Sequence, residues 1–324
     1  MIFMIQKTLI YAIPLLIVAL AGMFAERSGI INIALDGIMI FGSFIGAMTV
    51  YLFQTNGILL ENTQLMFVIA MAVAALAGAI FSLLLSFSAI NLKADQTIGG
   101  TALNLLAPAI TLFIVKIFFM QDKLVMPKDI KFVILNKDMS DIGRMFFDKA
   151  YISTYIVIGL FIILSIFMYK TKYGLRIRAC GEHPQAADSV GINVHRMRYI
   201  GTTISGALGG LGGYVYIATT AGGTAEGTVA GMGFLALAIM IFGNWKPVTI
   251  ALGSLLFGFL KCLSVIYTQL DINGDGVYAL AKLGLPMYFY NLIPYVTVLI
   301  VLAFTSKKSR APKAEGIPYD KGMR

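Results

Sequence analysis

Long apolar runs, separated by short polar stretches, recur along the whole chain. A run of about 20 apolar residues is long enough to cross the hydrocarbon core of a bilayer as an α-helix. The alternation of apolar and polar residues that marks a transmembrane barrel is absent. The pattern predicts an all-α, polytopic transmembrane bundle of about nine spans, within a range of eight to ten. The candidate spans are 8–25, 30–53, 65–90, 102–119, 151–169, 199–218, 229–243, 248–268 and 288–305.

Two places depart from a simple apolar helix. The span at 229–243 is short, and the stretch 26–53 is interrupted by polar residues. Broken helices are tolerated inside a membrane where protein or water satisfies the freed backbone groups. The sequence therefore leaves both a continuous and a discontinuous helix open at these two places.

The distribution of Lys and Arg predicts the orientation, because positively charged loops stay on the cytoplasmic side. If the loop 170–198 is cytoplasmic, fifteen of the 25 Lys and Arg residues lie inside, eight outside and two within spans. Six of the outer eight lie in the extracytoplasmic loop 120–150, where five Asp nearly balance them. We expect the N-terminus outside, a transmembrane domain over 1–306 and a basic cytoplasmic tail over 307–324.

The composition agrees with a membrane protein and excludes several functions. Hydrophobic residues make up 58% of the 324 residues and charged residues only 13%. The basic loops account for the net charge of +9, so it indicates no nucleic acid. Cys180 and Cys262 lack a metal-type spacing, and the phosphate-binding motif GxxxxGK[ST] is absent. We expect no catalytic activity, and any ATP that drives transport binds to another polypeptide.

A short helix is predicted in the middle of the loop 170–198, which contains GEHPQAADSVGIN. Pro184 suits a first helical turn, Glu182 is favourable near the positive helix end, and Gly191 suits a C-terminal cap. A helix of about seven residues is unstable alone, so it needs a surface to pack against. It either lies on its own protein or docks into a groove on a cytoplasmic partner. Its small apolar face consists of Ala186, Ala187 and Val190.

Polar side chains also occur inside or at the start of predicted spans. Burying such groups in lipid is costly, so they are expected to face the bundle interior or water. They either cap and pack broken helices or line the route of a substrate. The candidates are Asn32 and Asp36 in the second span, and Gln96, Thr101 and Asn104 at the start of the fourth.

Two further features concern packing. GxxxG pairs, such as Gly206/Gly210 and Gly42/Gly46, let helices approach closely. Trp245 is the only tryptophan and lies at a predicted cytoplasmic turn, where an anchor at the membrane interface is the expected role.

The spacing of Glu182, Ala186, Ala187 and Gly191 (E-x3-AA-x3-G) resembles the coupling-helix motif of ABC importer permeases. The surrounding stretch YGLRIRACGEHPQAADSVGINVHRMRYIGTTISGALGGLGG resembles the branched-chain amino acid and simple-sugar permease superfamily. Within it, the chain is most similar to the nucleoside importer permeases that work with basic-membrane-protein-type lipoproteins. The resemblance covers nearly the whole chain in order, and is weakest at 120–150 and 271–284. Its further stretches are ERSGIINIALDG, LKADQTIGGTALNLLA, GMGFLALAIMIFGNWKP and APKAEGIPYDKG.

The resemblance implies the transmembrane permease subunit of an ABC importer for nucleosides in a bacterial cytoplasmic membrane. This chain would bind no cofactor, and ATP with Mg would bind to a partner ATPase with two nucleotide-binding halves. The other implied partners are an extracytoplasmic solute-binding lipoprotein and a second permease subunit, either a related chain or another copy. The residues implied to couple to the ATPase are Glu182, His183, Ala186, Ala187, Asp188 and Gly191.

Three alternatives remain open from the sequence. A simple-sugar permease of the same superfamily would carry the same polar residues, since neutral donors and acceptors suit a sugar as well as a nucleoside. A secondary carrier would need ion-coupling carboxylates or ion pairs at mid-membrane, for which Asp36 is the single candidate. A scaffold that only assembles other membrane proteins would move no substrate.

Overall fold

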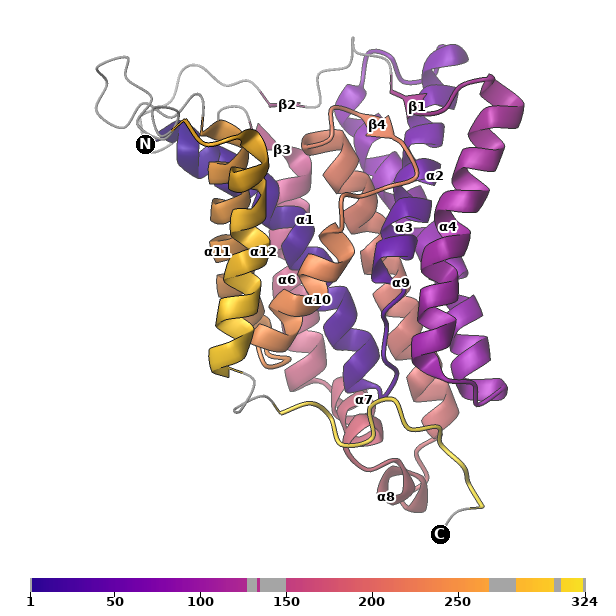
Figure 1. Ribbon diagram of the computed structural model, residues 1–324. Helices are drawn as coiled ribbons and strands as arrows, with labels where there is room; N and C mark the ends of the chain where they lie inside the picture. Colours follow the sequence, from indigo (N-terminus) through magenta and orange to yellow (C-terminus); the bar gives the residue numbers. More distant parts are fainter. Residues whose placement is uncertain (1, 127–132, 135–149, 268–283, 306–309, 323–324) are drawn as a thin grey trace.

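The computed structural model describes residues 2–126, 133–134, 150–267, 284–305 and 310–322. Its long helices run side by side as one bundle (Figure 1). The helices are α1 (Ile2–Arg27), α2 (Leu35–Thr55), α3 (Thr63–Ser86), the π-helical turn η1 (Phe87–Asn91), α4 (Gln96–Phe119), α6 (Ile152–Lys170), α7 (Lys172–Glu182), α8 (Pro184–Ser189), α9 (Val194–Thr219), α10 (Met232–Phe242), α11 (Pro247–Ile266) and α12 (Met287–Thr305).

Four strands of two residues each depart from the predicted all-α class. They are β1 (Leu124–Val125), β2 (Val133–Ile134), β3 (Ala150–Tyr151) and β4 (Thr224–Ala225). β1 pairs antiparallel with β4, and β2 with β3. The strands join connecting segments at the upper end of the bundle in Figure 1, where backbone groups outside the helices need partners of their own. The fold is otherwise helical, as predicted.

Among the described residues, six helices are long and apolar enough to cross a membrane: α1, α2, α3 together with η1, α4, α6 and α11. The prediction of nine such spans is therefore not confirmed. α10 has only 11 residues, which is about 16 Å of helix. α9 has 26 residues, long enough to cross, but its Gly-rich and Thr-containing sequence is not apolar enough to be counted. Because α9 is enclosed by other helices, it need not be apolar to suit lipid.

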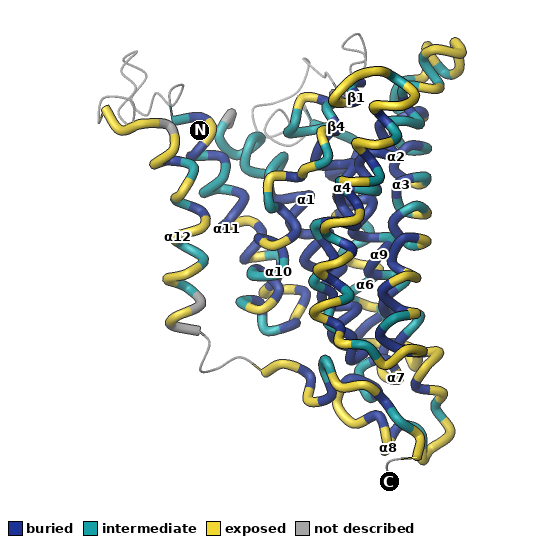
Figure 2. Tube along the Cα trace, turned by 45° about the vertical axis from the view of Figure 1, so that its right-hand side comes forward, coloured by how far each residue is buried: buried dark blue, intermediate teal, exposed yellow. Residues whose placement is uncertain are grey.

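α9 is the central helix, and it packs against α1, α2 and α3. The approach is close because glycines face glycines. A Cβ on Gly210 would lie 2.3 Å from the carbonyl oxygen of Ala74 in α3, and a Cβ on Gly42 in α2 would lie 2.3 Å from the Cα of Gly210. Only a residue without a side chain fits such a crossing. The predicted packing role of the GxxxG pairs is confirmed, and Figure 2 shows α9 largely buried within the bundle.

Both candidate places contain a non-helical segment. α1 ends at Arg27 and α2 begins only at Leu35, so residues 28–34 form a non-helical connection (the break segment). The segment between β4 and Met232 is also non-helical, and α10 begins part-way down the bundle in Figure 1. α2 is continuous from Leu35 to Thr55 and α10 from Met232 to Phe242, so at each place the interruption is a non-helical segment before a helix.

The two ends of the bundle differ in structure. One end, which we call the α8 face, is formed by α7, α8 and the C-terminal residues 310–322 (Figure 1). The opposite end, which we call the strand face, carries the four strands and the N-terminus. The coupling loop predicted at 170–198 thus lies at the end opposite to the strands.

Candidate functional site

The break segment follows the last turn of α1 and approaches the start of α4. Because its backbone is outside any helix, its N–H and C=O groups need partners from elsewhere. Gln96, the first residue of α4, is buried, and its Oε1 accepts a hydrogen bond from the N–H of Ile31 at 2.7 Å. Asp95 caps α4 itself by accepting from the N–H groups of Thr97 and Ile98. The sequence around 95–96 therefore both begins α4 and fixes the break segment.

Asn104, two turns further along α4, bridges the break segment and α2. Its Nδ2 donates to the carbonyl oxygen of Ile33 at 2.9 Å, and its Oδ1 accepts from the N–H of Gly37 at 2.7 Å. The N-cap residue of α2 is Ala34, which has no side chain able to accept a hydrogen bond. A side chain from another helix thus caps the start of α2.

Asp36 likewise caps the start of α10. Its Oδ1 accepts from the N–H of Gly233 at 2.9 Å, in the first turn of a helix whose N-cap residue, Gly231, has no side chain. A carboxylate at a helix N-terminus is also favoured by the helix dipole. The first turns of the two interrupted helices therefore meet, and each depends on a polar side chain supplied by a neighbouring helix.

Asn32 lies inside the break segment and is fully buried, with its Nδ2 donating to the Oγ of Ser205 in α9 at 2.8 Å. Thr101 is exposed on α4, and its hydroxyl donates to the carbonyl oxygen of Thr97 in its own helix. Of the five predicted pathway residues, the structure brings Asn32, Asp36, Gln96 and Asn104 together at the two breaks. Thr101 instead borders a shallow cavity of ≈ 350 Å³ on the outer surface of α4.

The short helix predicted in the loop 170–198 is α8, with six residues rather than seven. Pro184 occupies its first turn, and the Nδ1 of His183 accepts from the N–H of Ala186 at 3.4 Å. Gly191 follows the helix with φ +82°, the left-handed conformation expected of a C-terminal cap. The predicted helix boundaries are thus confirmed within a residue, and the N-cap side chain is His183.

The expected apolar face of α8 is divided between two directions. Ala187 is buried together with Pro184 against the protein, while Ala186 lies exposed and Val190 is 74% exposed. Asp188 is half-buried, and Gly191 is exposed. One side of this region therefore packs on its own chain, and the other presents small apolar and polar groups outward.

Glu182 ends α7 and pairs with Arg27, the last residue of α1, at 3.4 Å between Oε1 and Nη1. The same guanidinium donates to the carbonyl oxygen of Trp245 at 3.3 Å. Arg27 thus connects the segment that precedes α8, the end of α1 and the turn after α10. This contact joins residues far apart in the sequence, and no local motif indicated it.

The family model for the permease component of branched-chain amino acid transport systems matches residues 4–302. The chain belongs to this permease family. It is 41% identical over 99% of its length to the guanosine ABC transporter permease protein NupQ of Bacillus subtilis, of which it covers 97%. It is 38% identical over 98% of its length to the nucleoside ABC transporter permease protein NupC of Lactococcus lactis, of which it covers 96%.

The nucleoside ABC transporter permease protein NupB of the same Lactococcus lactis strain is a more distant relative. It is 25% identical over 50% of the present chain, and the match covers 42% of NupB. No solved structure matches the chain significantly. Family membership therefore rests on the family model and on the two relatives matched along their full length.

Sequence reasoning misjudged Trp245 in this permease. Its side chain is 3% exposed, and its Nε1 donates to the Oε2 of Glu26 at 2.6 Å. A buried indole with a carboxylate partner is not an anchor at the membrane interface.

Sequence reasoning also treated the C-terminal tail only as a basic extension, whereas residues 310–322 pack on the α8 face. The apolar residues Ala314 and Tyr319 within that basic tail, both buried, were the available signal.

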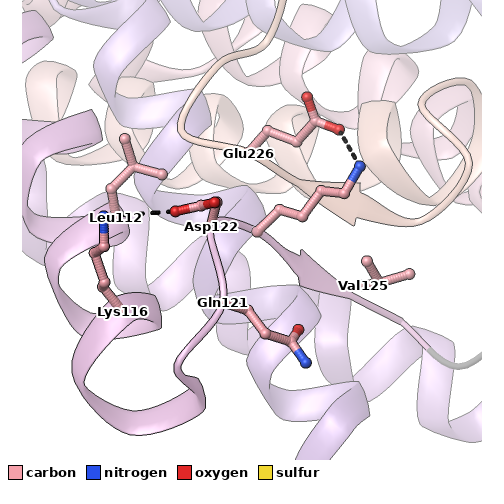
Figure 3. Close-up of a pocket in the computed structure, with 7 residues that line it drawn as sticks. Leu112, Lys116, Gln121, Asp122, Val125 and Glu226 are labelled. Atoms are coloured by element: carbon pink, nitrogen blue, oxygen red, sulfur yellow. Dashed lines mark ion pairs between the residues drawn. The ribbon is translucent and has the colours of Figure 1, made fainter.

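A cavity of ≈ 730 Å³ lies near the strand face and away from the predicted site residues (Figure 3). Two ion pairs cross it, from Lys116 to Asp122 at 3.6 Å and from Lys123 to Glu226 at 3.5 Å. Their side chains are about half exposed or more, so the pairs add little stability. The remaining lining residues are Leu112, Gln121 and Val125.

Proposed function

We propose that this permease is the transmembrane subunit of an ABC importer that carries nucleosides across the bacterial cytoplasmic membrane. The observation that carries the proposal is 38–41% identity, over nearly the full chain, to permeases named for guanosine and nucleoside transport. The chain would form the route and leave ATP hydrolysis to a partner ATPase, consistent with the lack of a phosphate-binding motif in its sequence.

The proposal places the α8 face in the cytoplasm and the strand face outside. Basic residues gather at the α8 face, as expected of a cytoplasmic surface. In this orientation α9, α10 and α12 would also contribute to crossing the membrane, with the interrupted helices enclosed by protein. The basic residues that support this orientation are Arg27, Lys93, Lys246, Arg310 and Lys313.

We assign coupling to α8. Its exposed side offers Ala186 and Val190, small enough to enter a groove, and the neighbouring His183, Asp188 and Gly191 would contact the same partner. ATP-driven closure of the ATPase would displace α8, and Glu182 would pass the movement to Arg27 at the end of α1. The inner packing of Ala187 supports this role, because it makes α8 part of the bundle and not a free loop.

The candidate pathway is the region where the two breaks meet. Asp36 is only partly buried and Thr101 is exposed, so both are open to a route along the bundle surface beside α4. A second permease subunit would close this surface. NupB and NupC, two differently named permeases of one strain, support a pair of unlike chains. A solute-binding lipoprotein would deliver the nucleoside at the strand face.

Uptake in proteoliposomes tests the proposal. The permease is reconstituted with its sister permease, its ATPase and the lipoprotein, and accumulation of radiolabelled guanosine is measured. We expect uptake to require ATP on the side of the α8 face. Uptake should stop when ATP is depleted while a proton gradient is kept, and excess ribose should not change it. Uptake sustained by the gradient alone would identify a secondary carrier, competition by ribose a sugar permease, and no transport of either compound a scaffold.

The coupling role predicts a distinct loss of function. Glu182→Lys replaces the ion pair with Arg27 by two positive charges that repel each other. Gly191→Val forces a β-branched residue into a left-handed conformation. We expect both variants to assemble in the membrane but to retain at most about a tenth of the wild-type uptake. A tenfold loss corresponds to about 1.4 kcal/mol of coupling free energy between the ATPase and the pathway. Glu61→Lys, the same charge change in the exposed α2–α3 connection, is the control. Normal uptake by both assembled variants contradicts the role.

A further inference from the structure

Residues 310–322 form a strap across the α8 face. The strap leaves the region below α12, runs past the end of α7 and reaches the start of α9 (Figure 1). Figure 2 shows buried positions alternating with exposed ones along it. Ala314 and Tyr319 are buried within it. A basic tail that was only solvated would show neither buried side chains nor specific partners.

Three backbone N–H groups of the strap are bonded to three separate parts of the permease. The N–H of Arg310 donates to the Oδ1 of Asn244 at 2.9 Å, in the turn that follows α10. The N–H of Ala314 donates to the carbonyl oxygen of Gly181 at 2.8 Å, and that of Gly316 to the carbonyl oxygen of Gly29 at 3.2 Å. The strap is therefore attached to the end of α7 and to the break segment at neighbouring positions.

Side chains attach the second half of the strap. Arg198, near the start of α9, donates from Nη1 to the carbonyl oxygen of Ile317 at 3.0 Å. The Tyr319 ring meets the His195 ring edge-on, with centroids 5.4 Å apart. Lys93, in the connection before α4, pairs with Asp320 at 2.7 Å. The strap thus also reaches the start of α9 and the connection that leads into α4.

These attachments have one property in common. The residues they reach lie in the segment that precedes α8 or next to the candidate pathway: in the break segment, at the start of α9, in the connection before α4 and in the turn after α10. α8 itself packs on α7 and α9. The strap therefore adds bonds from the end of α7 to the break segment and to the connection before α4. They supplement the ion pair between Glu182 and Arg27 and the direct packing of Gly181 on the backbone of Arg27 and Gly29.

The strap interface is also incompletely satisfied, which argues against a purely static role. Arg198 is 1% exposed, yet its Nε and Nη2 have no hydrogen-bond partner among the described residues. The same holds for the Oε2 of Glu315 and the Nε of Arg27. Buried polar atoms without partners are unusual and mark stored strain or a functional role. The strap is held by a few hydrogen bonds and one half-exposed ion pair, each of which adds little stability, so its attachment can change while the bundle stays folded.

We propose that the strap is a positioning element of the transport cycle, which holds the α7–α8 segment in register with the break segment and α4 so that displacement of α8 moves the pathway. Lys93, Arg198 and Asp320 are its positioning residues. The inference rests on the proposed function, because it needs an α8 that is moved by an ATPase.

A charge exchange tests the strap without deleting it. Asp320→Lys places two cations together, Lys93→Asp places two carboxylates together, and the double variant restores an ion pair in the reverse direction. In proteoliposomes that contain the whole importer, we measure nucleoside accumulated per ATP hydrolysed. We expect each single variant to lower this ratio about five-fold, with ATP hydrolysis and complex assembly retained, and the double variant to recover it. Glu61→Lys at the opposite end controls for the charge change.

Hydrogen exchange of the strap gives a second, independent readout. In the wild-type complex the amides of Ala314 and Gly316 are expected to be protected, and their protection is expected to change when ATP binds. Loss of residues 310–324 is expected to uncouple ATP hydrolysis from uptake. Full coupling in the truncated or singly substituted complexes, or protection that is the same with and without ATP, overturns the proposal.

The two hypotheses fail in different ways. If the wild-type importer hydrolyses ATP but moves no nucleoside, the proposed function is wrong. The ATP-dependent hydrogen exchange of the Ala314 and Gly316 amides still decides whether the strap responds to the ATPase. If the wild type transports and the variants keep its coupling ratio, only the strap hypothesis is wrong.

Discussion

Single side chains at the α8 face carry contacts that the bundle itself does not provide. Glu315 of the strap lies beside Glu26 and Arg27 at the end of α1, and its carboxyl group is hydrogen-bonded to that of Glu26. Two carboxyl groups can share such a bond only if one of them keeps a proton. Burial raises the pKa of Glu315, and this effect exceeds the lowering by the Glu26 hydrogen bond and by the charge of Arg27.

The raised pKa of Glu315 predicts a pH dependence of strap docking. A carboxyl whose pKa is raised in the docked state stabilises docking fully below its undocked pKa, about 4.3, and less as the pH rises through the docked pKa. Glu315→Gln removes this loss. We expect the amides of Ala314 and Gly316, after correction for intrinsic exchange, to lose protection in the wild type as the pH rises through the raised pKa of Glu315, and to lose less in the variant.

His195 and Asp320, two other titratable groups at the strap, are present in both the wild type and Glu315→Gln. Burial and the nearby cations lower the pKa of His195, so its protonation opposes docking on the acid side. The hydrogen bond from Lys93 lowers the pKa of Asp320, which therefore stays charged from pH 5 to 8. The difference between Glu315→Gln and the wild type isolates the pair of Glu26 and Glu315, and identical pH profiles would contradict the prediction.

Among the elements, the two interrupted helices have a common design. Each begins with a residue that cannot cap it, and each receives its cap from a neighbouring helix, Asn104 for α2 and Asp36 for α10. The sequence left helix capping and pathway lining as alternatives for these residues. The contacts establish capping, and a pathway role remains a proposal. The two roles are compatible, because a residue that fixes a broken helix also fixes the shape of any route beside it.

The capping role of Asn104 predicts a loss of stability. Asn104→Ala leaves the N–H of Gly37 and the carbonyl oxygen of Ile33 without their partner, which is expected to cost about 2 kcal/mol. Thr101→Ala, one helical turn earlier and exposed, is the matched control and is expected to change the free energy of unfolding by less than about 0.5 kcal/mol. Unfolding of the detergent-solubilised permease by heat or denaturant measures both. Equal effects of the two substitutions would show that Asn104 is no cap.

At the scale of the whole molecule, the crossing of α9 with α2 and α3 holds the bundle together. Gly42, Gly210 and Gly213 leave room for backbone atoms of the neighbouring helices, which cannot move aside as a flexible side chain can. α1, which packs on the same central helix and on α11, connects this core to the α8 face. A disturbance of α9 is therefore expected to affect folding more than transport.

Gly210→Val tests the central crossing. Its Cβ would lie 2.3 Å from the carbonyl oxygen of Ala74, so α3 and α9 must separate, and overpacking of this kind costs about 3 kcal/mol or more. We expect little folded protein in the membrane, as measured by fluorescence-detected size-exclusion chromatography. Gly159→Ala in α6 is the control, since a Cβ there meets nothing within 4 Å and alanine favours a helix. A Gly210→Val protein that is as abundant and monodisperse as this control would contradict the packing role.

Local patterns in the sequence determined the membrane class, the short helix between Pro184 and Gly191, and the places where helices break. These features depend on apolar runs, proline and glycine, whose effects act within one or two helical turns. Only the tertiary structure decided how the breaks are satisfied. Asn104 and Asp36 bond to backbone groups 67 and 197 positions away, and Lys93 meets Asp320 across 227 positions. A polar residue looks the same in the sequence whether it caps a distant helix, lines a route or faces water, because its partner is chosen by the packing of the bundle.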